Sequence, residues 1–256
     1  MLWPTLPVRR QNPPPAAGRQ AAPRPLASRS RIDAARRAAL DQSQRVRQQA
    51  EGRLSIKLHK NDLAAGVSFG RAVAVDSETL GLRTLRDRLC VVQLADGNGS
   101  AHLIQFDGKD WSAPRLKALL SDTSVLKIFH FARFDLGVLA HYLKVAPEPV
   151  YCTKIASKLV RTYTDRHGLR DLCSELLGVE LSKQQQSSDW AAEKLSDQQK
   201  QYAASDVLYL HALKAKLDAM LQREGRTAFA EACFRFLPVR AGLDLAGFED
   251  VDIFAH

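Results

Sequence analysis

Two carboxylates stand two residues apart at the end of an apolar run. In the segment AVAVDSET, residues 72–79, Asp76 and Glu78 follow four small or branched apolar residues. If the run is a strand, both side chains point to the same face, because strand side chains alternate. Two like charges so close are stable only when a cation lies between them or one of them takes up a proton. Carboxylate oxygens suit Mg²⁺ or Mn²⁺, but a solvated strand end also explains an isolated pair of this kind.

Asp135 is a third carboxylate in an apolar context. It follows the segment KIFHFARF, which predicts a strand that runs into a helix. Helical spacing places Asp135 on one face with Phe131 and with the apolar residues three to four positions further on. A carboxylate on such an inward face is costly unless it is paired or bound to a metal. The alternative to a metal is an ion pair, for which Arg133 and Arg166 are the candidates.

Tyr202 and Asp206 lie four residues apart in a segment that predicts one long helix from 197 to about 223. Ser196, with Gln199 three residues further on, forms a capping box that marks the start of this helix. The spacing places the phenol and the carboxylate side by side. They either form a hydrogen bond within the core or belong to a catalytic site.

The elements that must position these residues begin with β-rich runs. The alternation predicts strands at 54–59, 72–79, 89–95 and 101–106, and the turn sequence DGNG at 96–99 predicts a hairpin between the last two. We expect an antiparallel meander of these four strands. A β-to-α unit follows, with a helix from Pro114 through Leu120, a strand at 125–129 and a helix at 131–143.

After Tyr151 the pattern is helical almost throughout. Helices are predicted at 152–162, 168–177, 189–195, 197 to about 223, and 227–237. Strands followed by helices favour an α/β fold with a mixed central sheet, made of an antiparallel meander plus a parallel strand, flanked by helices and followed by a helical C-terminal half.

The order and context of these five residues resemble the DEDD exonucleases of the tyrosine subtype, and ribonuclease D in particular. The similarity continues through DRHGL at 165–169 and SDW at 188–190. Residues 54–256 resemble more specifically nano-RNase C, a compact ribonuclease D relative of alphaproteobacteria. That likeness is carried by FHFARFD at 129–135, KQQQSSDW at 183–190 and DIFAH at 252–256.

The resemblance implies a ribonuclease H-like exonuclease domain at 54–256. It also implies a metal-dependent 3′-5′ exoribonuclease that hydrolyses very short RNA, preferably dinucleotides, to 5′-mononucleotides by a two-metal-ion mechanism. In this family two divalent cations, Mg²⁺ or Mn²⁺, are held by four carboxylates, and a tyrosine places the attacking water. The matching residues are Asp76, Glu78, Asp135 and Asp206, with Tyr202 as the tyrosine. A homo-oligomer, an octameric ring, is implied as well.

Substrate contacts are a further expectation. Leu82 matches the position at which related oligoribonucleases insert a leucine between the last two bases, and a core leucine is the alternative. Trp190 either stacks on a base or belongs to the core. Candidates for sugar or phosphate contacts, including a cationic cap on a 5′-phosphate, are His130, Arg166, His167, Lys183, Gln184 and Ser187.

The net charge of +9 lies almost entirely in residues 1–50, which contain ten arginines, no lysine and two acids. The other 206 residues contain 27 basic and 26 acidic side chains, so they have little surplus positive charge to bind the phosphates of a long nucleic acid. A short substrate is more compatible with this near-neutral charge. Residues 1–50 are predicted to be a disordered Arg/Pro-rich extension, which is a targeting segment, a basic arm for RNA, or the result of a translation start assigned too far upstream.

The amino-acid composition indicates the general class of protein. With 45% apolar and 25% charged residues the chain has an ordinary globular composition, without an apolar stretch for a membrane span or a secretory signal. The four cysteines form no metal-binding cluster and are expected to be reduced. We therefore expect a cytoplasmic protein.

Two other functions are compatible with the pattern. Ribonuclease D-like 3′ trimming of tRNA or other structured RNA is one, although ribonuclease D carries further helical domains and only about 33 residues follow the predicted long helix. An inactive RNA-binding scaffold is the other, and the intact set of five residues disfavours it. Selectivity for RNA over DNA is left open.

Overall fold

A computed structural model describes residues 55–182 and 188–255 of the 256-residue chain. The predicted extension at 1–50 and the candidates Lys183, Gln184 and Ser187 therefore lie outside the described residues.

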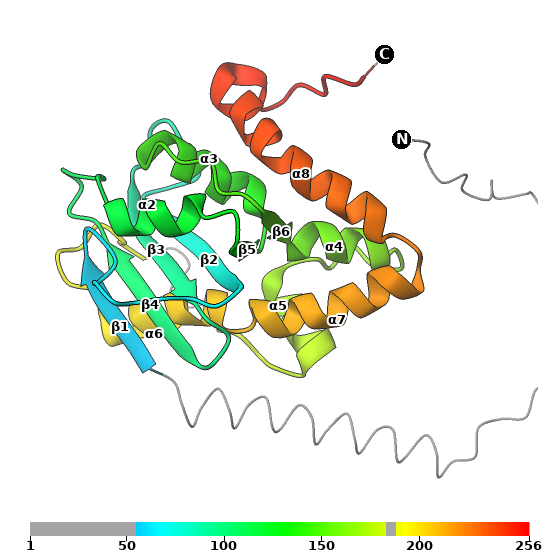
Figure 1. Ribbon diagram of the computed structural model, residues 1–256, viewed down its shortest axis with the longest axis horizontal. Coiled ribbons are helices and arrows are strands. Elements are labelled where there is room, and N and C mark those ends of the chain that lie inside the picture. Colours follow the sequence, from blue (N-terminus) through cyan, green and yellow to red (C-terminus); the bar gives the residue numbers. More distant parts are fainter. Residues whose placement is uncertain (1–54, 183–187, 256) are drawn as a thin grey trace, which may run out of the picture. The chain divides into compact units, whose positions relative to one another are not determined.

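A six-stranded mixed sheet with the order β1-β4-β3-β2-β5-β6 forms the centre of the described chain (Figure 1). β2, β3 and β4 form an antiparallel meander, and β5 and β6 continue the sheet parallel to β2. The strands are β1 Ser55–Lys60, β2 Ala72–Thr79, β3 Leu89–Ala95, β4 Ser100–Gln105, β5 Leu126–Phe129 and β6 Val150–Cys152. The mixed sheet with flanking helices confirms the predicted fold class.

Two strand predictions need correction. β1 does not continue the antiparallel meander, because it pairs in parallel with β4 at the edge of the sheet. β6 was missed, since three residues, Val150–Cys152, are too short to show an alternating pattern.

Helices cover both faces of the sheet. α6 packs across β2, β3 and β4 on one face, and α2 and α3 cover the other (Figure 1). Their bounds are α2 Pro114–Ser121, α3 Ala132–Tyr142, α4 Thr153–Val160, α5 Leu169–Leu172, η1 Cys173–Leu177, α6 Asp197–Leu208, α7 Leu210–Arg223, α8 Thr227–Leu243 and η2 Asp244–Phe248. None of the described helices combines the length and apolar character that a bilayer span requires.

Three helix predictions were wrong in detail. The predicted long helix is interrupted at Tyr209, which divides it into α6 and α7. The predicted helix at 189–195 is a series of turns, in which the carbonyls of Ala192 and Glu193 accept hydrogen bonds from Gln105 and Lys60. α8 continues past Pro238, because its buried apolar face extends on both sides of the proline.

Candidate active site

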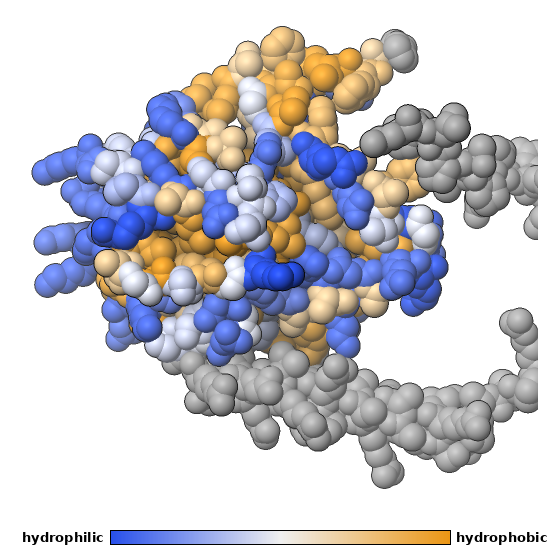
Figure 2. Space-filling model, viewed as in Figure 1, coloured by the Kyte–Doolittle hydropathy of each residue, from blue (hydrophilic) through white to orange (hydrophobic). Residues whose placement is uncertain are grey.

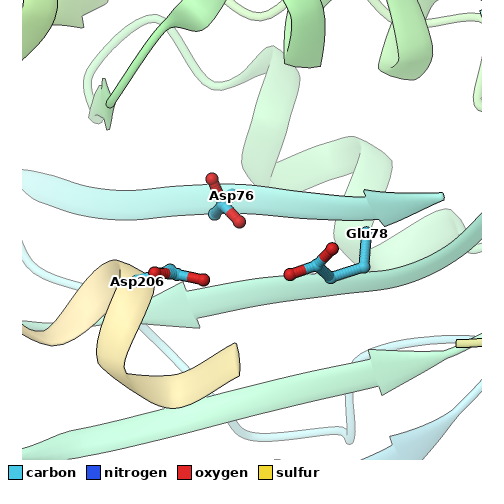
Figure 3. Close-up of side chains that lie close together, drawn as sticks. All are labelled: Asp76, Glu78 and Asp206. Carbon is cyan, nitrogen blue, oxygen red and sulfur yellow. The ribbon is translucent and has the colours of Figure 1, made fainter. Parts of the chain in front are cut away.

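The carboxylate cluster joins the end of β2 to the last turn of α6. Asp76 and Glu78 lie on the face of β2 that α6 covers, and Asp206 reaches toward them from the helix (Figure 3). One carboxylate oxygen of each residue lies within 4.8 Å of the others. The structure thus brings three of the four predicted metal ligands into one group.

The start of α6 is defined by the predicted capping box. The Ser196 hydroxyl accepts a hydrogen bond from the Gln199 amide at 3.2 Å, and the Gln199 side chain accepts one from the Ser196 amide at 2.9 Å. This cap satisfies backbone donors at the helix end and fixes where the helix begins. Tyr202 and Asp206, one turn apart, consequently face the end of β2.

Asp135 approaches from the opposite face of the sheet, on the first turn of α3. Its carboxylate is only 3% exposed and accepts a hydrogen bond from Ser77 Oγ at 2.6 Å. Neither expected arginine pairs with it, because Arg133 is held by Asp244 and Arg166 by Asp171. The ion-pair alternative for Asp135 is therefore wrong. Sequence reasoning missed this orienting role of the Ser77 hydroxyl.

Burial and mutual repulsion shape the electrostatics of the four carboxylates. Burial raises the pKa of Asp76 to about 7. Burial and then the neighbouring carboxylates raise the pKa of Glu78, and burial followed by repulsion from Asp76 raises the pKa values of Asp135 and Asp206 well above their ordinary range. A divalent cation would relieve both effects, and an all-oxygen donor set suits a hard cation. The residues present thus fit the metal that the pattern predicts.

Tyr202 is held against the cluster as a neutral phenol. Its side chain is hydrogen-bonded to Asp206, and burial, followed by the nearby carboxylates, raises its pKa above the usual value. The Trp190 ring packs on Tyr202 with centroids 6.0 Å apart and is only 2% exposed. The core alternative for Trp190 is thereby confirmed.

A cleft of about 870 Å³ opens over the carboxylates. Leu82 lines it with 83% of its surface exposed, so the alternative of a core leucine is wrong. The turn that presents Leu82 is held by Asp87, which accepts hydrogen bonds from the Arg83 amide at 3.0 Å and from the Arg86 side chain. Glycine at position 81 leaves room for the Asp87 carboxylate, because a Cβ there would collide with it.

The other described candidates for substrate contacts divide into two groups. His130 and Arg166 line the cleft. His130 is hydrogen-bonded to Thr153 at 2.9 Å, and burial, then the charge of Lys154, lowers its pKa to about 3, so it is a neutral imidazole. His167 is not among the lining residues and hydrogen-bonds to Ser157 at 2.8 Å instead.

Phe131 and Lys154 line the cleft although sequence reasoning did not select them as contacts. Phe131 has a left-handed backbone conformation, with φ of 66°, and its side chain is 46% exposed. The Lys154 ammonium lies 4.0 Å from the centre of its ring, a cation–π contact. Lys154 follows β6, so its position could be anticipated only if that short strand had been found.

Comparison with known proteins decides the family. Residues 55–222 match the model of a family described as 3′-5′ exonuclease. The chain belongs to this family. Among curated exonuclease relatives, ribonuclease D of Acidiphilium cryptum is 38% identical over 155 residues, which cover 60% of this chain and 39% of that protein. The chain thus spans about two fifths of the length of such curated relatives.

Solved structures confirm the resemblance to nano-RNase C. A structure described as Brucella melitensis NrnC bound to pGG is 60% identical and superposes with a TM-score of 0.76, covering 79% of this chain and 99% of the other. The Mg²⁺-bound form of that protein is 59% identical with the same TM-score and covers 79% and 100%. Together with the acidic cluster, these likenesses indicate that this exonuclease uses divalent metal.

Proposed function

We propose that the protein is a metal-dependent 3′-5′ exoribonuclease that hydrolyses very short RNA, preferably dinucleotides, to 5′-mononucleotides. The observation that carries the proposal is the group formed by Asp76, Glu78 and Asp206 at the base of the cleft, with Tyr202 beside it. Among the described residues no ion pair neutralises these carboxylates. A cluster of this kind supports binding of cations together with a phosphodiester.

Two divalent cations, Mg²⁺ or Mn²⁺, would be held by Asp76, Glu78, Asp135 and Asp206. When bound, such cations lower the pKa of water and stabilise negative charge on phosphoryl oxygens. Ser77 orients the Asp135 carboxylate through its hydrogen bond, and Asp206 is oriented by Tyr202. In the reaction, water forms a bond to the phosphorus of the 3′-terminal phosphodiester, and the bond from this phosphorus to the 3′ oxygen of the preceding nucleotide breaks. That oxygen gains a proton and leaves as a 3′ hydroxyl, and a nucleoside 5′-monophosphate is released.

Tyr202 has the role of a positioning donor for the attacking water. Its raised pKa keeps the hydroxyl protonated near neutral pH, which makes it unsuitable as a base and suitable as a hydrogen-bond partner. Bound cations would lower the pKa of the attacking water, so its proton can pass to solvent without a basic side chain.

A short substrate is supported by the lining of the cleft. Leu82 and Phe131 are exposed apolar side chains suited to contact bases, whereas Arg166 and Lys154 are cations suited to phosphate. The proposal also rests on the likeness to the NrnC structure that is described as bound to pGG. Leu82 is proposed to insert between the two bases.

A length series tests the substrate. Turnover of 5′-phosphorylated RNAs of two to seven nucleotides would be measured with Mg²⁺ and with Mn²⁺, and the dinucleotide is expected to give the highest kcat/KM. Equal values at all lengths would contradict the preference for dinucleotides. Matched DNA dinucleotides measure the selectivity for ribose.

We also propose a homo-oligomer, an octameric ring. Apolar surface gathers over the C-terminal part of the chain, at the top of Figure 2. Its exposed large apolar side chains are Val239, Phe248, Val251, Ile253 and Phe254. Exposed patches of this type are typical of protein interfaces. Native mass spectrometry should give eight copies, and a monomer at micromolar concentration would contradict the ring.

A ribonuclease D-like trimming activity is the second candidate, supported by the identity to ribonuclease D. A precursor tRNA with a short 3′ extension should be a much poorer substrate than a dinucleotide. Efficient trimming of the precursor would favour the second candidate.

A further inference from the structure

Gln93 is a fully buried amide in the middle of β3. Neither its Nε2 nor its Oε1 has a hydrogen-bond partner among the described residues. Each buried polar group left unpaired costs about 1–3 kcal/mol, and such groups are uncommon in folded proteins. Packing alone therefore does not explain an amide at this position, because an apolar side chain could be buried here at a lower cost in free energy.

The strand register places Gln93 directly opposite Asp76 in the antiparallel pair of β2 and β3. Residues that face each other in this way share a face of the sheet, with Cβ atoms about 4.5–5.5 Å apart. On its other side Gln93 is paired with Leu103 of β4. The side chain thus lies between an apolar neighbour and a carboxylate of the proposed metal site.

The layer above this position is apolar and closely packed. α6 covers this face, and the small side chain of Ala203 packs there with Val91 and Leu103. The strand register places the Asp76 carboxylate beside this amide, where it can accept a hydrogen bond from Nε2. The Gln93 side chain is long enough for Nε2 to reach a carboxylate on the neighbouring strand.

Gln105 provides a contrast on the same face of the same sheet. It is only 3% exposed, yet its Oε1 accepts from the Lys60 ammonium at 2.6 Å and its Nε2 donates to the Ala192 carbonyl at 2.7 Å. A buried glutamine in this layer can therefore have both ends satisfied within the protein. Gln93 lies closer to the carboxylates, and neither end of its amide is satisfied in this way.

We propose that Gln93 is a positioning residue for Asp76. When the carboxylates hold a divalent cation, Gln93 Nε2 donates a hydrogen bond to the Asp76 oxygen that is turned away from the cation. The inference rests on the metal site of the proposed function and adds a residue that orients one of its ligands. Partners of this kind typically change metal affinity by about 10- to 100-fold.

The substitution Gln93→Met tests the role, because methionine is similarly long and unbranched but has no amide. Calorimetric titration of the full chain with Mn²⁺ should show an affinity about tenfold weaker or worse. The thermal midpoint in chelator should stay the same or rise, since an unpaired polar group has been removed. A residue that serves only the core would leave the affinity for Mn²⁺ unchanged and alter only the thermal midpoint.

Gln105→Met is the matched control. It removes two existing hydrogen bonds, so the midpoint in chelator should fall while the affinity for Mn²⁺ stays within twofold of the wild type. Gln93→Leu provides a smaller replacement should methionine overfill the layer, and the same weakening of Mn²⁺ binding is expected.

The two proposals fail in distinguishable ways. If the wild type binds Mn²⁺ and both Gln93 variants bind it equally well, the positioning role is overturned and the proposed function stands. If the wild type binds no Mn²⁺, the metal site itself is wrong, and the inference falls with it.

Discussion

Charged side chains with little access to solvent are left unpaired in one region of this exonuclease and are compensated in another. At the end of β2 and on α6, the carboxylates of Asp76, Glu78 and Asp206 lie together, without an ion pair to any described residue. Around Arg161, by contrast, the charge is fully compensated. The first region therefore keeps an attraction for an external cation.

The Arg161 side chain is completely buried at the end of α4. It donates to Ser157 Oγ at 3.1 Å and to the Arg166 carbonyl at 2.6 Å, and it forms an ion pair with Glu175. The Tyr163 hydroxyl also donates to Glu175, at 2.6 Å. Every part of this network is directed at another part of the protein, so it stabilises the loop that carries Arg166 beside the cleft.

The contrast indicates how to separate structural from functional charge in this fold. A buried ion that is paired and hydrogen-bonded contributes to the folded state, and removal of a partner is costly. Buried ions of one sign weaken the fold until a ligand neutralises them. Substitutions in the two regions should therefore affect different measurements.

Asp76→Asn should have the largest effect. Loss of one negative charge and one ligand is expected to lower kcat/KM by at least about a thousandfold, which corresponds to about 4 kcal/mol, while stability in chelator does not fall. Activity on a dinucleotide and the thermal midpoint would be measured together. Asp197→Asn is the control on α6, since that carboxylate is 90% exposed and should change neither. Full metal-dependent activity of Asp76→Asn would remove the contrast between the regions.

Tyr202→Phe should have the next largest effect. Removal of the positioning hydroxyl should lower kcat about a hundredfold with little change in KM, because the phenol acts on the water and not on the bases. Steady-state kinetics on the dinucleotide provide the measurement. Tyr163→Phe, which removes a hydroxyl from the Arg161 network, should leave kcat unchanged. Equal turnover of Tyr202→Phe and wild type would contradict the assignment.

Arg161→Met should lower the free energy of unfolding by about 2 kcal/mol, measured in urea with chelator. The expected loss is below the roughly 3–5 kcal/mol typical of a broken buried pair, because Glu175 is 42% exposed and regains water. Affinity for Mn²⁺ should not change. Arg223→Met, in a surface pair with an arginine 67% exposed, is the control and should alter stability by less than about 0.5 kcal/mol. If Arg161→Met instead weakened Mn²⁺ binding, the two regions would not be independent.

Local features of the functional region were predictable from the sequence. Alternation in residues 72–79 placed Asp76 and Glu78 on one face, and the spacing of four placed Tyr202 beside Asp206. The capping box fixed the start of α6. All of these depend on short-range geometry, which a pattern in the chain expresses directly.

Long-range geometry was not predictable in the same way. The pairing of β1 with β4 and the position of β6 depend on contacts between distant segments. Nothing local indicates that Ser77 faces Asp135, or that Gln93 lies opposite Asp76, since both follow from how separate elements pack. The exposure of Leu82 likewise depends on the turn that Asp87 holds.

The smallest expected effect is a dependence of metal stabilisation on pH. Burial raises the pKa of Asp76 from its ordinary value of 3.8 to about 7. Between these values the folded protein keeps a proton that the unfolded chain releases, so the metal-free protein loses stability as pH rises from about 4 to about 7. Cation binding requires the ionised carboxylate, so the stabilisation by the metal grows over the same interval.

The thermal midpoint with Mn²⁺ minus that with chelator should therefore be larger at about pH 7.5 than at about pH 5.5, by roughly 2–4 °C for each kcal/mol of added binding energy. Scanning calorimetry at the two pH values measures it. Arg161→Met should lower every midpoint and leave this difference unchanged, because its charge is compensated within the protein. Asp76→Asn should reduce the difference at both pH values, since the titrating ligand is gone. A difference that does not vary with pH in the wild type would mean that the carboxylates are already ionised without the cation, and the proposed strain between them would be absent.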